Sequence, residues 1–369
     1  MDDRYPASDT TISTRIDRDK AVAAINDLGL PKYRTEHWKY TNPKPIIEEL
    51  RESPSACPVA PTRIEGEVEI LPFDCFEAKK AISEYVGSIA VGGTSSMPSL
   101  NLLNLTTGYV IRSTDSKGSV PAVKIHPSPT HCERILILVE EGASLKVIES
   151  SMGGNRVIEC IVQENARLVH TRLQEATNSV EYGALSVQVN SNASYVLDQY
   201  STGTSLRRNE ITVDVLGEES SVEIKGGWNL ESKSHLDSQV CVNHLVPRSR
   251  SQVKFHGVAG DDSRSVFNGR LYIARDAQHT SAHLTNKNIL TGENAEIYTK
   301  PELEIYADDV VCSHGATSGQ LDEDQVFYMR TRGLPNARAR ELLLNGFLQE
   351  VIDDELGSEI LGLKPLNLV

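Results

Sequence analysis

The spacing of apolar residues changes along the chain. Residues 16–28 carry apolar residues at helical spacing, and Gly29 and Pro31 then supply a stop. From about residue 100 the period becomes two, in segments such as RILILVEE, RVIECIVQE, EITVDVLGEE and AEIYTKPELEIYA. No helical pattern separates these segments, so the sequence predicts a long series of short β-strands.

The turns between these strands resemble one another. Each turn begins with a polar pair, continues through a Gly, Asn or Glu corner and a small residue, and ends in a new strand. The turns are EEGASL, QENARL, NSNASY, GEESSV and GENAEI. Four of the small residues are spaced by 23, 27 and 27 positions: Ala143, Ala166, Ala193 and Ser220. This spacing fits one rung of a solenoid with two strands per rung. A β-sandwich is the alternative, but matched small corner residues favour stacked rungs. The predicted fold is therefore mainly β, a parallel β-helix.

The C-terminal part returns to a helical pattern. Asp322 and Gln325 resemble a capping box, Gly333 marks a stop, and Pro335 suits the first turn of a second helix. Apolar residues of that helix form one stripe: Ala339, Leu342, Leu343, Phe347 and Val351. Such a stripe must be covered, either by the neighbouring helix and the solenoid or by a partner. The predicted organisation is a helical or mixed region at 1–90, a β-helix at 100–318 and a helical region at 319–369.

Composition narrows the class of protein. The 369 residues carry a net charge of −14, which argues against nucleic-acid or anionic-membrane binding. No apolar run reaches the length of a membrane helix, and the polar start MDDRYPASDTTIST lacks the features of a signal peptide. The six cysteines are scattered singly, without a CxxC pair. A cytoplasmic protein with reduced thiols is expected.

Cys312 and His314 are the candidate metal ligands. On a strand, positions two apart share one face, and thiolate with imidazole suits iron, zinc or copper(I). Two ligands do not complete a four-coordinate site, so others would come from elsewhere or from another chain. The residues alone favour the simpler interpretation, a cysteine at a strand end beside a hydrogen-bonded histidine.

Other catalytic patterns are missing or poorly placed. The sequence contains no GxGxxG, GxxxxGK[ST] or GxSxG motif. Cys241 and His244 are three apart and should face opposite ways on a strand, and Asp308 and Asp309 are adjacent, a poor geometry for glycoside hydrolysis. The chain therefore carries no self-sufficient active site and is not expected to be an enzyme.

Three stretches together resemble a known family. GLPKYRTEHWKYTNPKPI (29–46) is similar to an E-x-W-K-Y-T segment near the start of SufD members of the SufB/SufD family, which belongs to the SUF iron–sulfur cluster assembly system. SVFNGRLYIARDAQHTSAHLTNKNIL and KPELEIYADDVVCSHGATSGQLDEDQVFYMRTRGLPNARARELLLNGFLQEVI resemble the C-terminal half of that family. The short chain and the absence of a dense cysteine cluster favour the SufD branch. Val311 and Ser318 depart from the family pattern, where Lys and Val are common.

The resemblance implies a fold and a set of partners. It implies a right-handed parallel β-helix between two helical regions, which pairs with SufB through the β-helices. The C-terminal region would dock a SufC ATPase, so that Leu342, Leu343, Phe347 and Val351 become candidate partner-binding residues. One SufB, one SufD and two SufC subunits would form a non-catalytic scaffold that receives sulfur from a cysteine desulfurase system.

The resemblance also implies a site. The family histidine that matches His314 lies at the SufB–SufD interface near a SufB cysteine, and the role of the cysteine that matches Cys312 is less certain. A transient iron–sulfur cluster would form there with ligands shared by SufB, and a reduced flavin is associated with the assembled complex. No cofactor is expected on the isolated chain. The alternatives are a SufB-like homodimeric scaffold and, in a different class, a β-helix enzyme acting on polysaccharide, which the 5% aromatic content disfavours.

Overall fold

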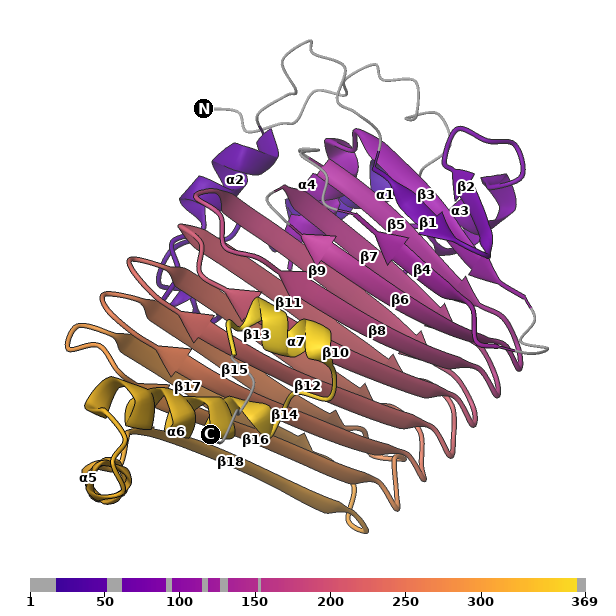
Figure 1. Ribbon diagram of the computed structural model, residues 1–369. Helices are drawn as coiled ribbons and strands as arrows, with labels where there is room; N and C mark the ends of the chain where they lie inside the picture. The colour runs from indigo at the N-terminus through magenta and orange to yellow at the C-terminus, as the bar shows by residue number, and fades with distance from the viewer. Residues whose placement is uncertain are drawn as a thin grey trace.

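The computed structural model describes residues 18–51, 62–90, 95–114, 119–126, 132–151 and 154–363 (Figure 1). The polar start of the chain, on which the predicted absence of a signal peptide rests, lies outside these residues, as does Cys57. Helices precede and follow the strands: α1 (Arg18–Leu28), the 3-10 helix η1 (Glu36–Trp38), α2 (Lys44–Arg51), α3 (Lys79–Tyr85) and α4 (Met97–Leu103), then α5 (Glu323–Thr331), α6 (Asn336–Gln349) and α7 (Glu355–Ile360).

The strands form two sheets of nine strands each, and consecutive strands alternate between the sheets along most of the chain. Sheet A contains, in spatial order, β1 (Ile64–Gly66), β4 (Ala122–Ile125), β6 (Ser144–Ser151), β8 (Arg167–Gln174), β10 (Ser194–Thr202), β12 (Ser221–Leu230), β14 (Arg250–Ala259), β16 (Ser281–Leu290) and β18 (Val311–Gln320). Sheet B contains β2 (Glu69–Pro72), β3 (Thr107–Ser113), β5 (Cys132–Val139), β7 (Asn155–Val162), β9 (Val180–Val189), β11 (Leu206–Val215), β13 (His235–His244), β15 (Arg264–Ile273) and β17 (Glu296–Ile305).

Pairing within each sheet is parallel except at the N-terminal end, where β1 and β2 pair antiparallel with β4 and β3. The prediction of a mainly β parallel solenoid with helices at both ends is confirmed. The predicted domain boundaries stay predictions. α4 spans residue 100, and β18 continues to Gln320, past the predicted boundary at 318.

Six corners that lead from sheet B to sheet A, from β5–β6 to β15–β16, have the same backbone geometry. The residue before the small corner residue has a positive φ, between 55° and 69°, at Gly142, Asn165, Asn192, Glu219, Arg248 and His279. The next residue is buried in every case: Ala143, Ala166, Ala193, Ser220, Ser249 and Thr280. A left-handed residue turns the chain sharply, and only a small side chain fits beneath the turn. GENAEI, by contrast, lies in the opposite row of corners, between β16 and β17.

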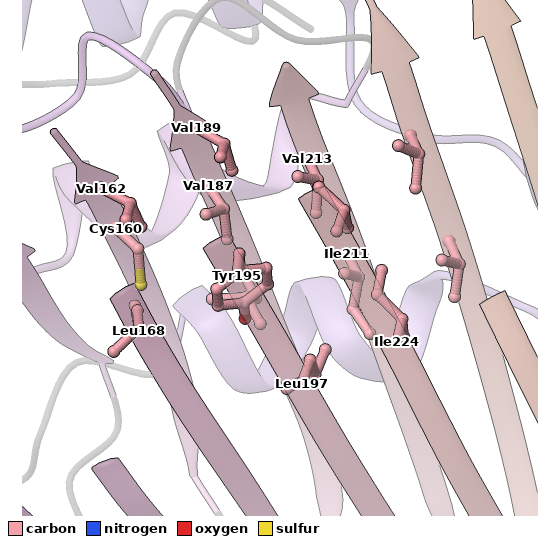
Figure 2. Close-up of a cluster of buried hydrophobic side chains, with 14 of the residues drawn as sticks. Cys160, Val162, Leu168, Val187, Val189, Tyr195, Leu197, Ile211, Val213 and Ile224 are labelled. Carbon is pink, nitrogen blue, oxygen red and sulfur yellow. The ribbon is translucent and has the colours of Figure 1, made fainter. Parts of the chain in front are cut away.

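The space between the sheets, here called the lumen, is filled by inward-facing side chains. Figure 2 shows Cys160, Val162, Leu168, Val187, Tyr195 and Ile224 meeting there from both sheets. Because each parallel register aligns equivalent positions, every strand adds one layer to the same aliphatic core. Cys160 is a small residue of this core, as its position in VIECIV predicts.

The helical regions cover the outer faces. Ile25, Leu50 and Leu100 of the N-terminal helices join a cluster with outward residues of sheet B such as Val157 and Ile161. In Figure 1 the yellow helices α6 and α7 lie across the strands of sheet A, and α5 stands at the side. No helix among the described residues is long and apolar enough to cross a membrane.

The C-terminal end of the solenoid is left open. β17 and β18 are the last strands of sheets B and A, so each has a hydrogen-bonded neighbour on one side only. Most side chains of β18 are exposed, with Val311 at 66%. An unpaired strand edge can pair with a strand of another chain. The unpaired edge of β18 lies beside the candidate ligands.

Candidate functional site

Both candidate ligands lie on β18, the open edge of sheet A. The register pairs Cys312 with Ala282 and His314 with Leu284 on β16. Ala282 and Leu284 belong to the core, and Cys312 packs against the same cluster, so this row of β18 faces the lumen. The prediction that Cys312 and His314 share one face follows from the strand geometry. They lie at the mouth of the lumen, where no further rung of the described chain covers them.

The two side chains differ in environment. Cys312 is half-buried, and burial raises the pKa of its thiol while a backbone hydrogen bond at Ala282 opposes that effect. A thiol with a raised pKa is protonated at neutral pH, so a metal must displace its proton to bind. His314 is exposed. Its imidazole is therefore the more accessible candidate ligand, whereas Cys312 must lose its thiol proton before it can bind a metal.

These ligands do not form a complete metal site by themselves. Within the described ranges, no group of three or more His, Cys, Asp or Glu side chains is placed to hold a metal ion. Asp309, at the corner before β18, pairs with His279, at the corner before β16, with 2.9 Å between Oδ2 and the ring Nδ1. Cys312 and His314 by themselves supply two candidate ligands, so a metal bound there would need further ligands from elsewhere.

A hydrogen-bonded set on the opposite face of β18 ties the strand to β16. The Ser313 hydroxyl lies 2.7 Å from His283 Nδ1, and Ser281 Oγ lies 3.3 Å from His283 Nε2. These contacts fix the backbone between Cys312 and His314 from the face of β18 that points away from the lumen. Sequence reasoning missed them because His283 and Ser313 are 30 positions apart, and only the register of β16 with β18 brings them together.

The lumen beside the candidate ligands is polar. Asn286 Oδ1 accepts hydrogen bonds from Thr299 Oγ1 at 2.8 Å and from Asn288 Nδ2 at 2.7 Å, and that Asn288 amide also lies 3.3 Å from the Thr317 carbonyl. Asn286 is aligned with Ala316 on β18, two positions beyond His314. Hydrogen bonds from side chains at the mouth of the lumen thus connect β16, β17 and β18. They hold β18, the strand that carries the candidate ligands, in place.

The predicted partner-binding residues, three in α6 and Val351 just after it, separate into two groups. Val351 is fully buried, and Phe347 stacks on His256 of β14 with ring centroids 4.6 Å apart, so both contact the solenoid. Leu342 and Leu343 are half-buried. Leu343 lines a hollow with Tyr328 and Met329 of α5, a helix whose Phe327 and Tyr328 are 64% and 58% exposed. The exposed apolar surface therefore centres on α5, which the sequence pattern did not single out.

A different hollow, of about 550 Å³, lies between residues 28–38 and the outer face of sheet B. Its arginines are already paired, Arg208 with Glu210 and Asp237, and Arg270 with Glu304. Cys241 lies in its wall, whereas His244 faces the lumen and contacts Ser249 and Ser251, so the two do face opposite ways. The guanidinium groups of this wall are therefore already engaged by carboxylates of the protein itself.

Comparison with known proteins places these features in a family. The family model described as SUF system FeS cluster assembly, SufBD core domain, matches residues 124–347, more than half of the chain. The chain belongs to the SufBD family. The match covers most of the solenoid, the strand with Cys312 and His314, and the greater part of the C-terminal helices.

Several relatives carry names from the same system. A chloroplastic protein of Arabidopsis thaliana, ABCI7, is 34% identical over 243 residues, 63% of this chain and 51% of that protein. An iron-sulfur cluster assembly SufBD family protein of Synechocystis is 28% identical over 300 residues, 74% and 66% of the two chains. The iron-sulfur cluster assembly protein SufD of Escherichia coli is 31% identical over 221 residues, 58% and 52%. The aligned part thus spans about half to two thirds of these relatives. Their names fit a SufD-like member of the family.

Proposed function

We propose that this chain is a SufD-like scaffold subunit that pairs end to end with a SufB-type subunit, so that an iron–sulfur cluster forms at their junction. The observation that carries the proposal is the half-site at the open end: Cys312 and His314 face the lumen mouth on an unpaired edge strand. The cluster is the cargo of this site, with its remaining ligands supplied by the partner.

The two open edges differ in their capacity to pair with a partner strand. In a parallel sheet, consecutive residues point their N–H and C=O groups to opposite sides of the strand. Val311 N–H binds the Thr280 carbonyl on the side of β16, so the even-numbered residues from 312 to 320 direct their backbone groups to the free edge of β18. No proline interrupts this row. β18 therefore offers a continuous set of donors and acceptors.

β17 lacks such a continuous row. Glu296 N–H binds the Ser263 carbonyl on the β15 side, so odd-numbered residues face the free edge, and Pro301 is one of them. Proline has no N–H, and its presence blocks strand pairing at the middle of this edge. The asymmetry supports docking of a partner strand along β18, beside His314.

The C-terminal helices support a second contact, with a SufC-type ATPase. α5 is tied to α6 by Arg340 and Glu323, 2.6 Å apart, and presents Phe327 and Tyr328 to solvent. Leu342 and Leu343 stay predicted partner residues, whereas Phe347 and Val351 hold α6 on the solenoid. The scaffold has no turnover of its own, and its sulfur comes from a cysteine desulfurase system.

The cofactor and location expectations remain predictions. The reduced flavin implied for the assembled complex has no residue assigned to it in this chain, and the isolated chain is expected to carry no cofactor. A cytoplasmic location is proposed, and the Arabidopsis relative is named as chloroplastic.

One assembly experiment tests the pairing. Co-expression with SufB and SufC, followed by native mass measurement, is expected to give one copy of this chain, one SufB and two SufC. Ala316→Pro removes one free-edge N–H of β18 without a loss of pairing to β16, and it should abolish SufB association, whereas Ala316→Ser should preserve it. Leu343→Asp should lower the SufC content alone. Full SufB binding by Ala316→Pro would contradict docking along β18.

The same measurement addresses the homodimeric alternative. The free edge of β18 also suits a second copy of this chain, which is the observation that favours a SufB-like homodimer. A homodimer that persists after co-expression with SufB would establish that alternative. The 550 Å³ hollow does not favour the polysaccharide enzyme, because Trp38 is the only Trp, Tyr or Phe side chain in its wall.

A further inference from the structure

The segment that contains EHWKYT has no part in the proposed function, yet it reaches the open end of the solenoid. Residues 35–41, here called the strap, run between α1 and α2 over the outer face of sheet B. They contact Arg208 on β11, His235 on β13 and Tyr298 on β17. The strap therefore spans successive strands of sheet B up to the last one.

The middle of the strap is anchored by Trp38 and Arg208. Trp38 is only 5% exposed, and the guanidinium carbon of Arg208 lies 3.7 Å from the centre of its ring. Arg208 Nη1 also donates to the His37 carbonyl at 3.0 Å and to Asp237 Oδ2 at 2.6 Å. A buried guanidinium that stacks on an indole and donates hydrogen bonds to two neighbours is a rigid contact, so this part of the strap is fixed to β11 and β13.

Two further contacts reach β17. The rings of Tyr40 and Tyr298 stack with centroids 4.1 Å apart and an interplanar angle of 18°. Lys300 Nζ donates to Glu36 Oε1 at 3.1 Å, and this bond lowers the pKa of the Glu36 carboxyl below its ordinary value. Tyr298 and Lys300 are the two outward-facing residues just before Pro301 on the same strand.

β17 needs such support more than the other long strands of sheet B. It is paired only with β15, and Pro301 removes an N–H from its free edge. Its inward residues Thr299 and Leu303 form the wall of the lumen mouth that faces β18. If β17 frayed, the polar contact between Thr299 and Asn286 beside the candidate ligands would be lost.

We infer that the strap is a positioning element that holds β17 in place, so that the wall of the lumen mouth opposite His314 is formed before a partner arrives. Tyr40 and Glu36 are its positioning residues, and Trp38 is its anchor. The N-terminal region thus controls the geometry of the C-terminal end of the solenoid. The strands of that end lie some 260 residues later in the sequence.

Hydrogen exchange of the isolated full chain, read by mass spectrometry, tests this inference. The double variant Glu36→Ala with Tyr40→Ala is expected to exchange at least about tenfold faster in peptides covering 296–305. Peptides from β9 and β11 should exchange as in the wild type, because Trp38 and Arg208 still anchor the strap. The conservative variant Tyr40→Phe keeps the stacked ring and should restore slow exchange when Glu36 is present.

Two results would overturn the inference. One is unchanged exchange of 296–305 in the double variant. The other is a uniform acceleration over all of sheet B, which would mark the strap as a general cover and not as a positioning element for β17. Lys300→Met provides a second route, since it removes the ion pair without a change to the strap itself and should accelerate 296–305 by a smaller factor.

The consequence for partner binding rests on the proposed function and is measured separately. The double variant should bind SufB at least about tenfold more weakly while Tyr40→Phe binds normally. Fast exchange at β17 with unchanged SufB affinity would remove the link to the partner and leave the positioning role. Failure of the wild-type chain to bind SufB would contradict the proposed function and leave the exchange result unaffected.

Discussion

At the scale of single residues, charged side chains occupy the lumen of the N-terminal half of the solenoid. Glu149 lies 2.7 Å from Arg172 Nε, 3.3 Å from Arg156 Nη1 and 3.2 Å from His170 Nε2, and all four residues are buried. Burial by itself would raise the pKa of Glu149, but attraction to Arg172, His170 and Arg156 outweighs it and holds that pKa well below its ordinary value. This carboxylate is ionised and shared between three cationic or polar partners.

Loss of this carboxylate should be costly. Glu149→Leu leaves Arg172 and Arg156 buried with less counter-charge, and breaking a buried pair in this way costs about 3–5 kcal/mol. Lys146→Leu, on the exposed face of the same strand, should change the free energy of unfolding by less than about 0.5 kcal/mol. Denaturant unfolding of both variants gives the comparison. Equal stabilities would show that the lumen charges contribute little.

The sequence could reveal only part of this residue-scale picture. The two-residue spacing of Cys312 and His314 is enough to place them on one face of a strand. The lumen charges could not be inferred in the same way. Glu149 and Arg172 are in phase with the core residues Val147 and Leu168, but charged side chains are expected to face solvent unless they are paired. They are stable inside only because the register aligns opposite charges from neighbouring rungs, and register is a property of the folded chain.

At the scale of elements, the strands and corners follow from local sequence, whereas the docking of helices does not. Small residues such as Ala166 and Ala193 mark the corners because the left-handed residue before them leaves no room for more. The apolar stripe of α6 predicts that something covers it. Its actual cover, His256 against Phe347 and Tyr200 near Val351, depends on outward residues of sheet A that lie about 90 to 150 positions earlier.

Docking of the C-terminal helices should depend on pH through Asp198. This residue of β10 is buried beside Asp353 and Asp354, and burial, with repulsion from those carboxylates, raises its pKa to about 6. Since the folded pKa lies above the unfolded one, the stability that Asp198 contributes is complete below about pH 4 and is lost as the pH rises through about 6. Docking should therefore be weaker at pH 8 than at pH 5.

Asp198→Asn tests this pH dependence. The amide carries no charge, so the variant should be more stable than the wild type at pH 8, by up to about 3 kcal/mol, and nearly equal to it at pH 4. Thermal unfolding at both values, with hydrogen exchange of α7 as a local readout, measures the effect. A gain of the same size at both pH values would contradict titration of Asp198 as the cause.

At the scale of the whole molecule, the two ends of the solenoid are different. The N-terminal end is closed by the antiparallel strands β1 and β2 and by the helices packed on sheet B, while the C-terminal end exposes β17 and β18. Pro301 restricts one of these edges, and the strap holds it from outside. The sequence predicts the solenoid and its last strand. It does not predict the closure of the N-terminal end, because that closure depends on contacts between segments that are distant in the sequence. A scaffold that forms a cluster at one junction requires this polarity.

The most direct test uses the proposed complex of this chain with SufB and SufC, supplied anaerobically with iron and sulfide. Its visible absorption, with iron and sulfide determined per complex, measures the cluster formed. His314→Ala should leave the mass and composition of the complex unchanged and lower its cluster content by about tenfold or more, because one ligand at the junction is lost. Cys312→Ala should have a smaller effect, since its thiol must first lose a proton. A cluster content equal to that of the wild type in His314→Ala would contradict a shared site at the open end of the solenoid.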